Sequence, residues 1–196
     1  MEELSLLVTL TAPTLIGISE TWLVDDDNDM IHLPSDNFIH KPRINKKGGG
    51  VGFFISDVFN YELVDISIKF FTFEYLVLKL HFYNHIFYCC VIYRPPDTLI
   101  SSFNEEISIL LTLILKRSKT IFLLGDFNID LLKSADSLSP THIFYSTLLS
   151  FNLLPTIFLP TRVTPNCSSI IDNIFTNFPL INSTSFVISY DISDHF

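Results

Sequence analysis

Short apolar runs separated by polar loops recur along the chain, and their period distinguishes strands from helices. Runs rich in β-branched and aromatic residues, bounded by turn residues, predict strands. These runs are Thr14–Ser19, Val51–Ser56, Phe73–Phe82, His85–Tyr93, Thr120–Leu124, Ser168–Thr176 and Thr184–Tyr190. Tyr83 and Asn84 separate the third run from the fourth, which predicts a hairpin. The polar stretch 25–47 predicts a loop.

Helical spacing replaces strand spacing in three segments. Glu2–Thr11 predicts an amphipathic helix, and Thr141–Phe151 predicts a helix that follows Pro140. Leu99–Arg117 predicts a further helix, because its apolar residues recur at helical intervals. The residues expected on the buried face of this helix are Phe103, Ile107, Leu110, Leu111 and Ile114.

The order of these elements favours an α/β fold in which the sheets are not purely parallel. Helices and strands are interspersed, and the expected hairpin adds an antiparallel pair. A two-layer core of sheets with helices outside is the natural packing. The chain has 196 residues, of which 48% are apolar and 19 are Phe, so a sizeable core is available. We expect one domain over residues 1–196, without internal repeats.

Composition excludes several classes of protein. Charged residues and histidines interrupt the longest apolar stretch, Phe70–Tyr93, so no run is long enough to span a membrane. Acidic residues flank the first apolar stretch, which is atypical of a signal peptide. The three cysteines show no disulfide framework or zinc spacing, and the adjacent Cys89 and Cys90 should point to opposite faces of a strand. We expect an intracellular protein whose glycosylation sequons, at Asn166 and Asn182, are unused.

The formal net charge of −9 argues against a simple basic clamp for nucleic acid. It is compatible with a metal-dependent nuclease, because the active site of such an enzyme must itself be rich in carboxylates. Basic residues near the phosphates, or in neighbouring domains, would then provide the attraction for DNA.

Polar residues that could take part in chemistry lie where the predicted strands end, except for Asp172, which lies inside the run Ser168–Thr176. They are Glu20, Tyr93, Arg94, Asp126, Asn128, Asp172, Asp194 and His195. Strand ends on a rigid scaffold are common places for functional sites. If these side chains converge, they form an acidic pocket suited to Mg²⁺ and substrate phosphate oxygens.

These residues also have purely structural interpretations, and Asp194 with His195 is compatible with a solvated terminus. Glu20 after a strand is compatible with a solvated loop or a cap, and Gly125 with Asp126 is compatible with a tight turn. Tyr93 and Arg94, before two prolines, are compatible with surface packing. Asp130, which follows in the same segment, is expected at the surface or as a capping residue.

Six motifs, in this order, resemble the endonuclease/exonuclease/phosphatase superfamily. They are GISETWL, GGGVGFFIS, VIYRPP, LLGDFNID, SSIIDNIFT and SDHF, and together they extend from about Leu15 to Phe196. The SETW and YRPP forms are similar to the apurinic/apyrimidinic-type endonuclease domain of non-LTR retrotransposons. The resemblance implies a DNase I-like, four-layer α/β sandwich of two mixed sheets flanked by helices. It also implies Mg²⁺ (or Mn²⁺) as cofactor and DNA as substrate.

The resemblance further implies a role for each matching residue. Glu20 and Asp194 would be metal ligands, and Tyr93 would contact the scissile phosphate. Asp126 would position or deprotonate the attacking water, and Asn128 would orient Asp126 and the phosphate. Asp172 would pair with the catalytic His195, and Arg94 would lie near the phosphate.

Two parts of the family pattern are missing from this sequence. The family has an earlier strand with an asparagine in a pattern like N-x-R-S, and it continues past the Asp-His. We therefore expect a fold that lacks the first and the last strand, in a chain truncated at both ends.

Three functions remain open at this stage. The first is a monomeric, metal-dependent DNA-nicking module of a retrotransposon polyprotein, with a downstream reverse transcriptase and a nuclear location. The second is a catalytically inactive remnant of the same fold. The third is a phosphatase of the same superfamily that acts on a phosphorylated lipid or small molecule.

Overall fold

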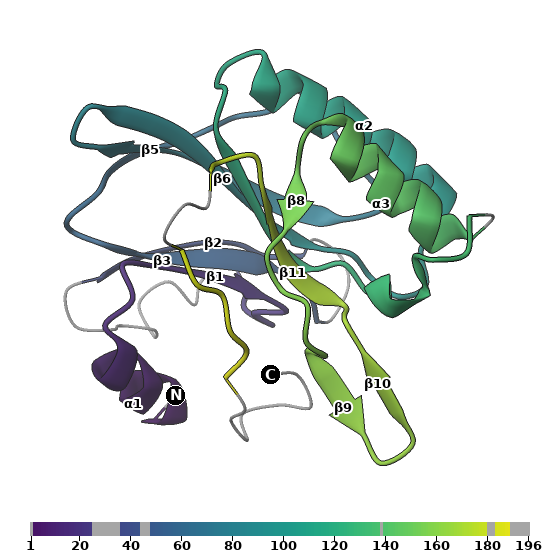
Figure 1. Ribbon diagram of the computed structural model, residues 1–196. Coiled ribbons are helices and arrows are strands. Elements are labelled where there is room, and N and C mark those ends of the chain that lie inside the picture. The colour runs from purple at the N-terminus through teal and green to yellow at the C-terminus, as the bar shows by residue number, and fades with distance from the viewer. Residues whose placement is uncertain (1, 25–35, 44–47, 138, 180–182, 189–196) are drawn as a thin grey trace.

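The computed structural model describes residues 2–24, 36–43, 48–137, 139–179 and 183–188 (Figure 1). Its smaller sheet has the order β1-β3-β2, and all of its pairs are antiparallel. The strands of this sheet are β1 (Leu15–Ser19), β2 (Asp36–Lys41) and β3 (Val51–Ser56).

The larger sheet has the strand order β4-β5-β6-β7-β11-β8. It is mixed, because β6 and β7 pair in parallel while its other pairs are antiparallel. Its strands are β4 (Asn60–Leu63), β5 (Glu74–Phe82), β6 (His85–Tyr93), β7 (Ile121–Asp126), β8 (Leu154–Pro155) and β11 (Asp172–Thr176). A separate hairpin consists of β9 (Arg162–Thr164) and β10 (Cys167–Ser169).

The helices are α1 (Glu2–Thr11), α2 (Ile100–Leu115) and α3 (Pro140–Ser150), and a short 3₁₀ helix, η2, covers Leu131–Lys133. Figure 1 shows α2 and α3 together on one side of the large sheet, the small sheet on its other side, and α1 beyond the small sheet. These layers are those of the α/β sandwich that the sequence predicts. No described helix is long and apolar enough to cross a membrane.

Two hydrophobic cores hold the layers together. One lies between the large sheet and the helices, and the other lies between the two sheets. Cys90 belongs to the first core and Cys89 to the second, so the prediction that they point to opposite faces is confirmed. The predicted buried face of α2 is also confirmed for all of its residues.

Some predicted elements are wrong. Ser168–Thr176 is two strands, because Ile170 and Ile171 bond to other segments at the position where the ladder would continue. Their carbonyls accept from Leu131 N and Phe127 N, respectively. The segment 184–188 forms no strand, and Ser189 and Tyr190 lie outside the described residues.

The sequence also left several strands unpredicted. Asp36–Lys41 is β2, an edge strand within the stretch predicted to be a loop. The others are β4, β8 and β9, which are all short. The prediction of two mixed sheets holds for the large sheet, whereas the described strands of the small sheet are antiparallel.

Candidate active site

One end of the large sheet carries a row of polar residues from four neighbouring strands. Tyr93 ends β6, and its register partners are Glu74 on β5 and Asp126 on β7. Asp126 is in turn opposite Asp172, the first residue of β11. Register partners point to the same face of a sheet, and adjacent strands are about 4.8 Å apart. The fold therefore brings together the predicted Tyr93, Asp126 and Asp172.

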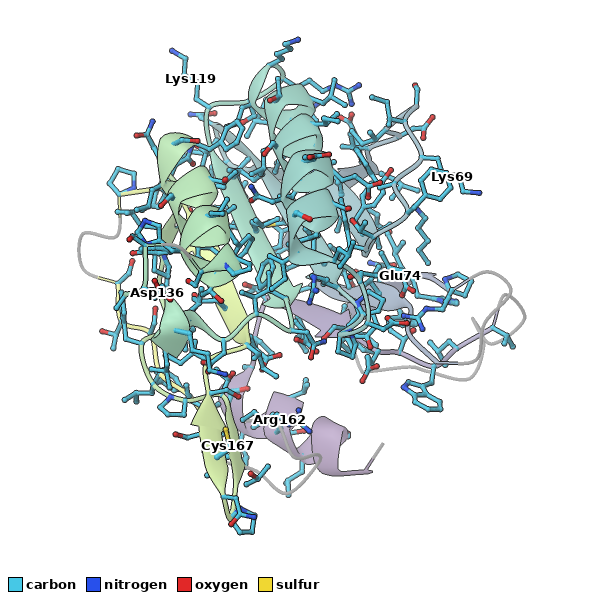
Figure 2. The ribbon with its side chains drawn as sticks, turned by 90° about the vertical axis from the view of Figure 1, so that its right-hand side faces the viewer. Lys69, Glu74, Lys119, Asp136, Arg162 and Cys167 are labelled. Carbon is cyan, nitrogen blue, oxygen red and sulfur yellow. The ribbon has the colours of Figure 1, made fainter. Side chains whose placement is uncertain are left out.

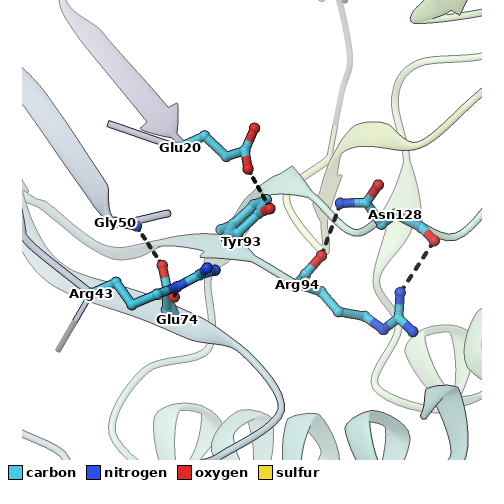
Figure 3. Close-up of polar contacts among 7 residues, drawn as sticks. All are labelled: Glu20, Arg43, Gly50, Glu74, Tyr93, Arg94 and Asn128. Atoms are coloured by element: carbon cyan, nitrogen blue, oxygen red, sulfur yellow. Dashed lines mark hydrogen bonds and ion pairs between the residues drawn. The ribbon is translucent and has the colours of Figure 1, made fainter. Parts of the chain in front are cut away.

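Glu20 joins this row from the other sheet. It directly follows β1 in a left-handed conformation, with φ of 55°. The hydroxyl of Tyr93 donates a hydrogen bond to Oε1 of Glu20 (Figure 3). The ring of Tyr93 is buried, whereas the Glu20 side chain is exposed. Burial, followed by the hydrogen bond to Glu20, raises the pKa of Tyr93, so its hydroxyl stays protonated and can donate.

Asn128 holds both carboxylate oxygens of Asp126. The Asn128 backbone N–H donates to Oδ1 at 2.8 Å, and its side-chain amide donates to Oδ2 at 3.0 Å. This geometry requires a left-handed Asn128, with φ of 48°, which asparagine tolerates better than most residues. The spacing of Asp126 and Asn128 therefore reflects a side-chain turn rather than a continued strand, because β7 ends at Asp126.

Arg94 points into the protein. Its side chain is 2% exposed, and its guanidinium donates to the carbonyl oxygens of Phe127, Asn128 and Thr98. The carbonyl of Arg94 in turn accepts from the Asn128 amide at 2.9 Å (Figure 3). These contacts give Arg94 a role in fixing the loop that carries Asn128. Its contact with phosphate stays a prediction.

An ion pair between Arg43 and Glu74 lies beside Tyr93, and the sequence did not predict it. Nε of Arg43 donates to Oε1 of Glu74, and Gly50 N donates to Oε2 (Figure 3). The Arg43 guanidinium lies 5.3 Å from the centroid of the Tyr93 ring. Both charged side chains are mostly buried, so the pair tethers the segments around Arg43 and Gly50 to the start of β5.

Replacing Glu74 with glutamine should lower the free energy of unfolding by about 2 kcal/mol, since hydrogen bonds to charged groups contribute about 1.5–3 kcal/mol. The glutamine leaves Arg43 as a mostly buried cation without its counter-charge. Urea denaturation followed by circular dichroism would measure the loss. The matched control is Glu62→Gln, which removes an exposed glutamate paired with Lys79 on the same sheet and should change stability little. Equal effects of the two variants would contradict a supporting role for the Arg43–Glu74 pair.

Two described carboxylates are candidate ligands for a metal ion. The exposed Glu20 carboxylate and the Asp126 carboxylate are hard oxygen donors, and Mg²⁺ needs only one or two of these beside water and substrate oxygens. No group of three or more His, Cys, Asp or Glu side chains suited to a metal occurs among the residues described here. Asp194 and His195, the other predicted members, lie outside the described residues.

The sequence matches the Endonuclease/Exonuclease/phosphatase family over residues 1–195, so the chain belongs to that family. Comparison with curated proteins gave no match. The fold is similar to the endonuclease domain of TRAS1, a telomere-specific non-LTR retrotransposon, with a TM-score of 0.68 and 14% identity. That match covers 88% of this chain and 76% of the TRAS1 domain.

Two further structures have the same fold. The D. rerio TDP2 complex with a single-strand DNA product has a TM-score of 0.61 and 12% identity, and the match covers 89% of this chain and 75% of that one. The human nocturnin catalytic domain with a bound sulfate anion has a TM-score of 0.61 and 15% identity. That match covers 89% of this chain and 73% of nocturnin's. The expected DNase I-like fold and superfamily are thereby confirmed.

Proposed function

We propose that this chain is a divalent-metal-dependent endonuclease that hydrolyses phosphodiester bonds in DNA, with Mg²⁺ or Mn²⁺. The observation that carries the proposal is the row Tyr93–Asp126–Asp172 at one end of the large sheet, with Glu20 bonded to Tyr93 across the sheets. The row combines a protonated donor, a fixed carboxylate and a candidate metal ligand at neighbouring strand ends.

Each side chain has a role in the proposed reaction. Asp126, fixed by Asn128, accepts the proton of the attacking water. With Glu20 engaged by the cation, the Tyr93 hydroxyl would turn its single proton from Glu20 to a phosphate oxygen, where negative charge grows in the transition state. A divalent cation held by Glu20 would neutralise phosphate charge. Asp172 would orient His195, and Asp194 would add a further ligand.

The retrotransposon origin is part of the proposal. The TRAS1 endonuclease domain is among the most similar folds, and the SETW and YRPP forms favour the same branch. A chain of this kind would act on nuclear DNA, as a monomeric module beside a reverse transcriptase.

The test is nicking of supercoiled plasmid by the purified chain. We expect relaxed circles with Mg²⁺ and none after chelation. Glu20→Gln should raise the Mg²⁺ concentration for half-maximal nicking at least about tenfold, because it removes the charge of a metal ligand. Glu62→Gln, which removes an exposed glutamate of β4, is the control and should leave the Mg²⁺ requirement unchanged. Nicking that persists in chelator would contradict the proposal.

An inactive remnant of the same fold is the second candidate. A folded chain that nicks no plasmid in Mg²⁺ or Mn²⁺ would support this candidate. Release of phosphate from p-nitrophenyl phosphate by the same preparation, without nicking, would instead favour a small-molecule phosphatase.

A further inference from the structure

Trp22 is a large apolar side chain held out in solvent beside the candidate active site. It is 60% exposed, and it lies two residues after Glu20. Its Cα is therefore at most about 7 Å from that of Glu20. None of the roles described above uses this side chain.

The backbone of Trp22 is fixed in an uncommon conformation. Its φ is 57°, in the left-handed region that bulky residues rarely adopt. Its N–H donates to the Gly49 carbonyl at 2.8 Å, and Thr21 N donates to the Gly50 carbonyl at 3.2 Å. Gly49 and Gly50 lie in the segment that Glu74 holds through Gly50 N. The same network that surrounds Tyr93 therefore also sets the position of Trp22.

The glycine at position 48 makes room for the indole. A Cβ atom on Gly48 would lie 3.3 Å from Cζ2 and 3.4 Å from Cε2 of Trp22. One side of the indole thus rests on bare backbone, and more than half of the residue's surface still faces solvent. An aromatic side chain that contacts backbone on one side and is mostly exposed is suited to stacking.

We propose that Trp22 is a stacking platform for a nucleotide base next to the scissile phosphate. This inference rests on the proposed nuclease function and narrows its substrate to nucleic acid with an accessible base. The net charge of −9 weakens the electrostatic attraction between the protein and the phosphate backbone. The affinity for nucleic acid therefore has to come from uncharged contacts. Stacking on an aromatic ring is such a contact, and it tolerates any base sequence.

Trp22 is the only tryptophan in the chain, so its fluorescence reports this position alone. The experiment titrates the protein, without metal, with a single-stranded oligothymidylate and with an abasic sugar–phosphate oligomer of equal length. We expect the oligothymidylate to quench the emission of Trp22. The abasic oligomer should leave most of this emission unquenched. Equal quenching by both oligomers would overturn the proposal.

Binding is measured separately, by the fluorescence anisotropy of end-labelled oligothymidylate. Trp22→Ala should weaken binding about 5- to 150-fold, and Trp22→Phe should restore most of it. The matched control is Tyr83→Ala. Tyr83 is also an exposed aromatic residue with positive φ, 51°, but it lies in the β5–β6 turn, about 30 Å along β6 from Tyr93.

The outcomes separate the two proposals. If the wild type binds and Trp22→Ala, shown to be folded by circular dichroism, binds equally well, Trp22 is no platform, and the nuclease proposal stands. If the wild type neither binds the oligomer nor nicks plasmid, the nuclease proposal fails as well. Loss of binding in Trp22→Ala but not in Tyr83→Ala supports the stacking role.

Discussion

Replacing Asp126 with asparagine should slow plasmid nicking by about 10²–10⁴-fold, the usual contribution of a positioned acid or base. In the proposed reaction this carboxylate takes the proton of the attacking water, and an amide cannot do so. Asp126 is 4% exposed, and Asn128 donates to both of its oxygens. The carboxylate is therefore fixed in one orientation before any substrate arrives.

The substitution also disturbs the local hydrogen bonds, and this effect must be measured separately. An amide at position 126 places an NH₂ group against one of the two donors of Asn128, so a stability loss of about 1–3 kcal/mol is expected. Urea denaturation gives this loss, and nicking is then assayed well below the unfolding transition. The kinetic effect has to persist when more than nine-tenths of the variant is folded.

Asp130→Asn is the matched control for Asp126→Asn. Asp130 caps η2, where its Oδ1 accepts from Leu132 N and Ile170 N, and an amide oxygen can accept the same bonds. Nicking by Asp130→Asn should stay within about twofold of the wild type, since the cap is preserved. If both variants retain full activity, Asp126 is not the base in this chain.

The elements that the sequence predicted well are those in which local pattern and tertiary burial agree. The apolar spacing in α2 corresponds to the residues that the structure buries. The β5–β6 hairpin was also predictable, because its two apolar runs are separated only by Tyr83 and Asn84. The prediction that Asp130 is a surface or capping residue is confirmed for the capping role.

Edge strands were missed because they need few apolar residues. In β2, Phe38 stacks on its register partner Phe54 at 4.4 Å between centroids, and Ile39 packs against the core between the sheets. Only these two apolar residues mark a six-residue strand, so the segment resembles a polar loop. Pairing with β3 and packing against the core are tertiary effects, and no local period reveals them.

The candidate site shows the same difference between contacts that are local in sequence and contacts that need the tertiary fold. Asp126 and Asn128 could be predicted as a pair because they are two residues apart and their contact is local. Arg43 and Glu74 are separated by 31 positions, and the two meet only when the sheets pack. The left-handed conformation of Trp22 likewise depends on its bond to Gly49, and Thr21, the residue after Glu20, bonds to Gly50. Glycine allows two backbones to approach closely, so the run Gly48–Gly50 was the sequence signal for this contact.

Replacing Gly125 with alanine should lower the free energy of unfolding by more than about 3 kcal/mol, which is beyond the usual range for a single substitution. Gly125 has φ of 135°, a conformation that residues with a Cβ rarely adopt. A Cβ atom there would also lie 1.9 Å from the carbonyl oxygen of Ile92, its register partner on β6. The clash is with backbone in the centre of the sheet, so neither strand can relieve it by a change of rotamer.

Gly17→Ala is the informative comparison, measured by the same urea denaturation. A Cβ atom on Gly17 would lie 2.3 Å from Cδ1 of Leu124, which is the far end of a flexible side chain, and the φ of Gly17 is not positive. Leu124 can rotate away, so the loss should be about 1–2 kcal/mol, typical of a tight core contact. Equal losses at the two positions would mean that the backbone at Gly125 adapts as readily as a leucine side chain. Since Asp126 follows Gly125 directly, such adaptation would also displace the proposed catalytic carboxylate.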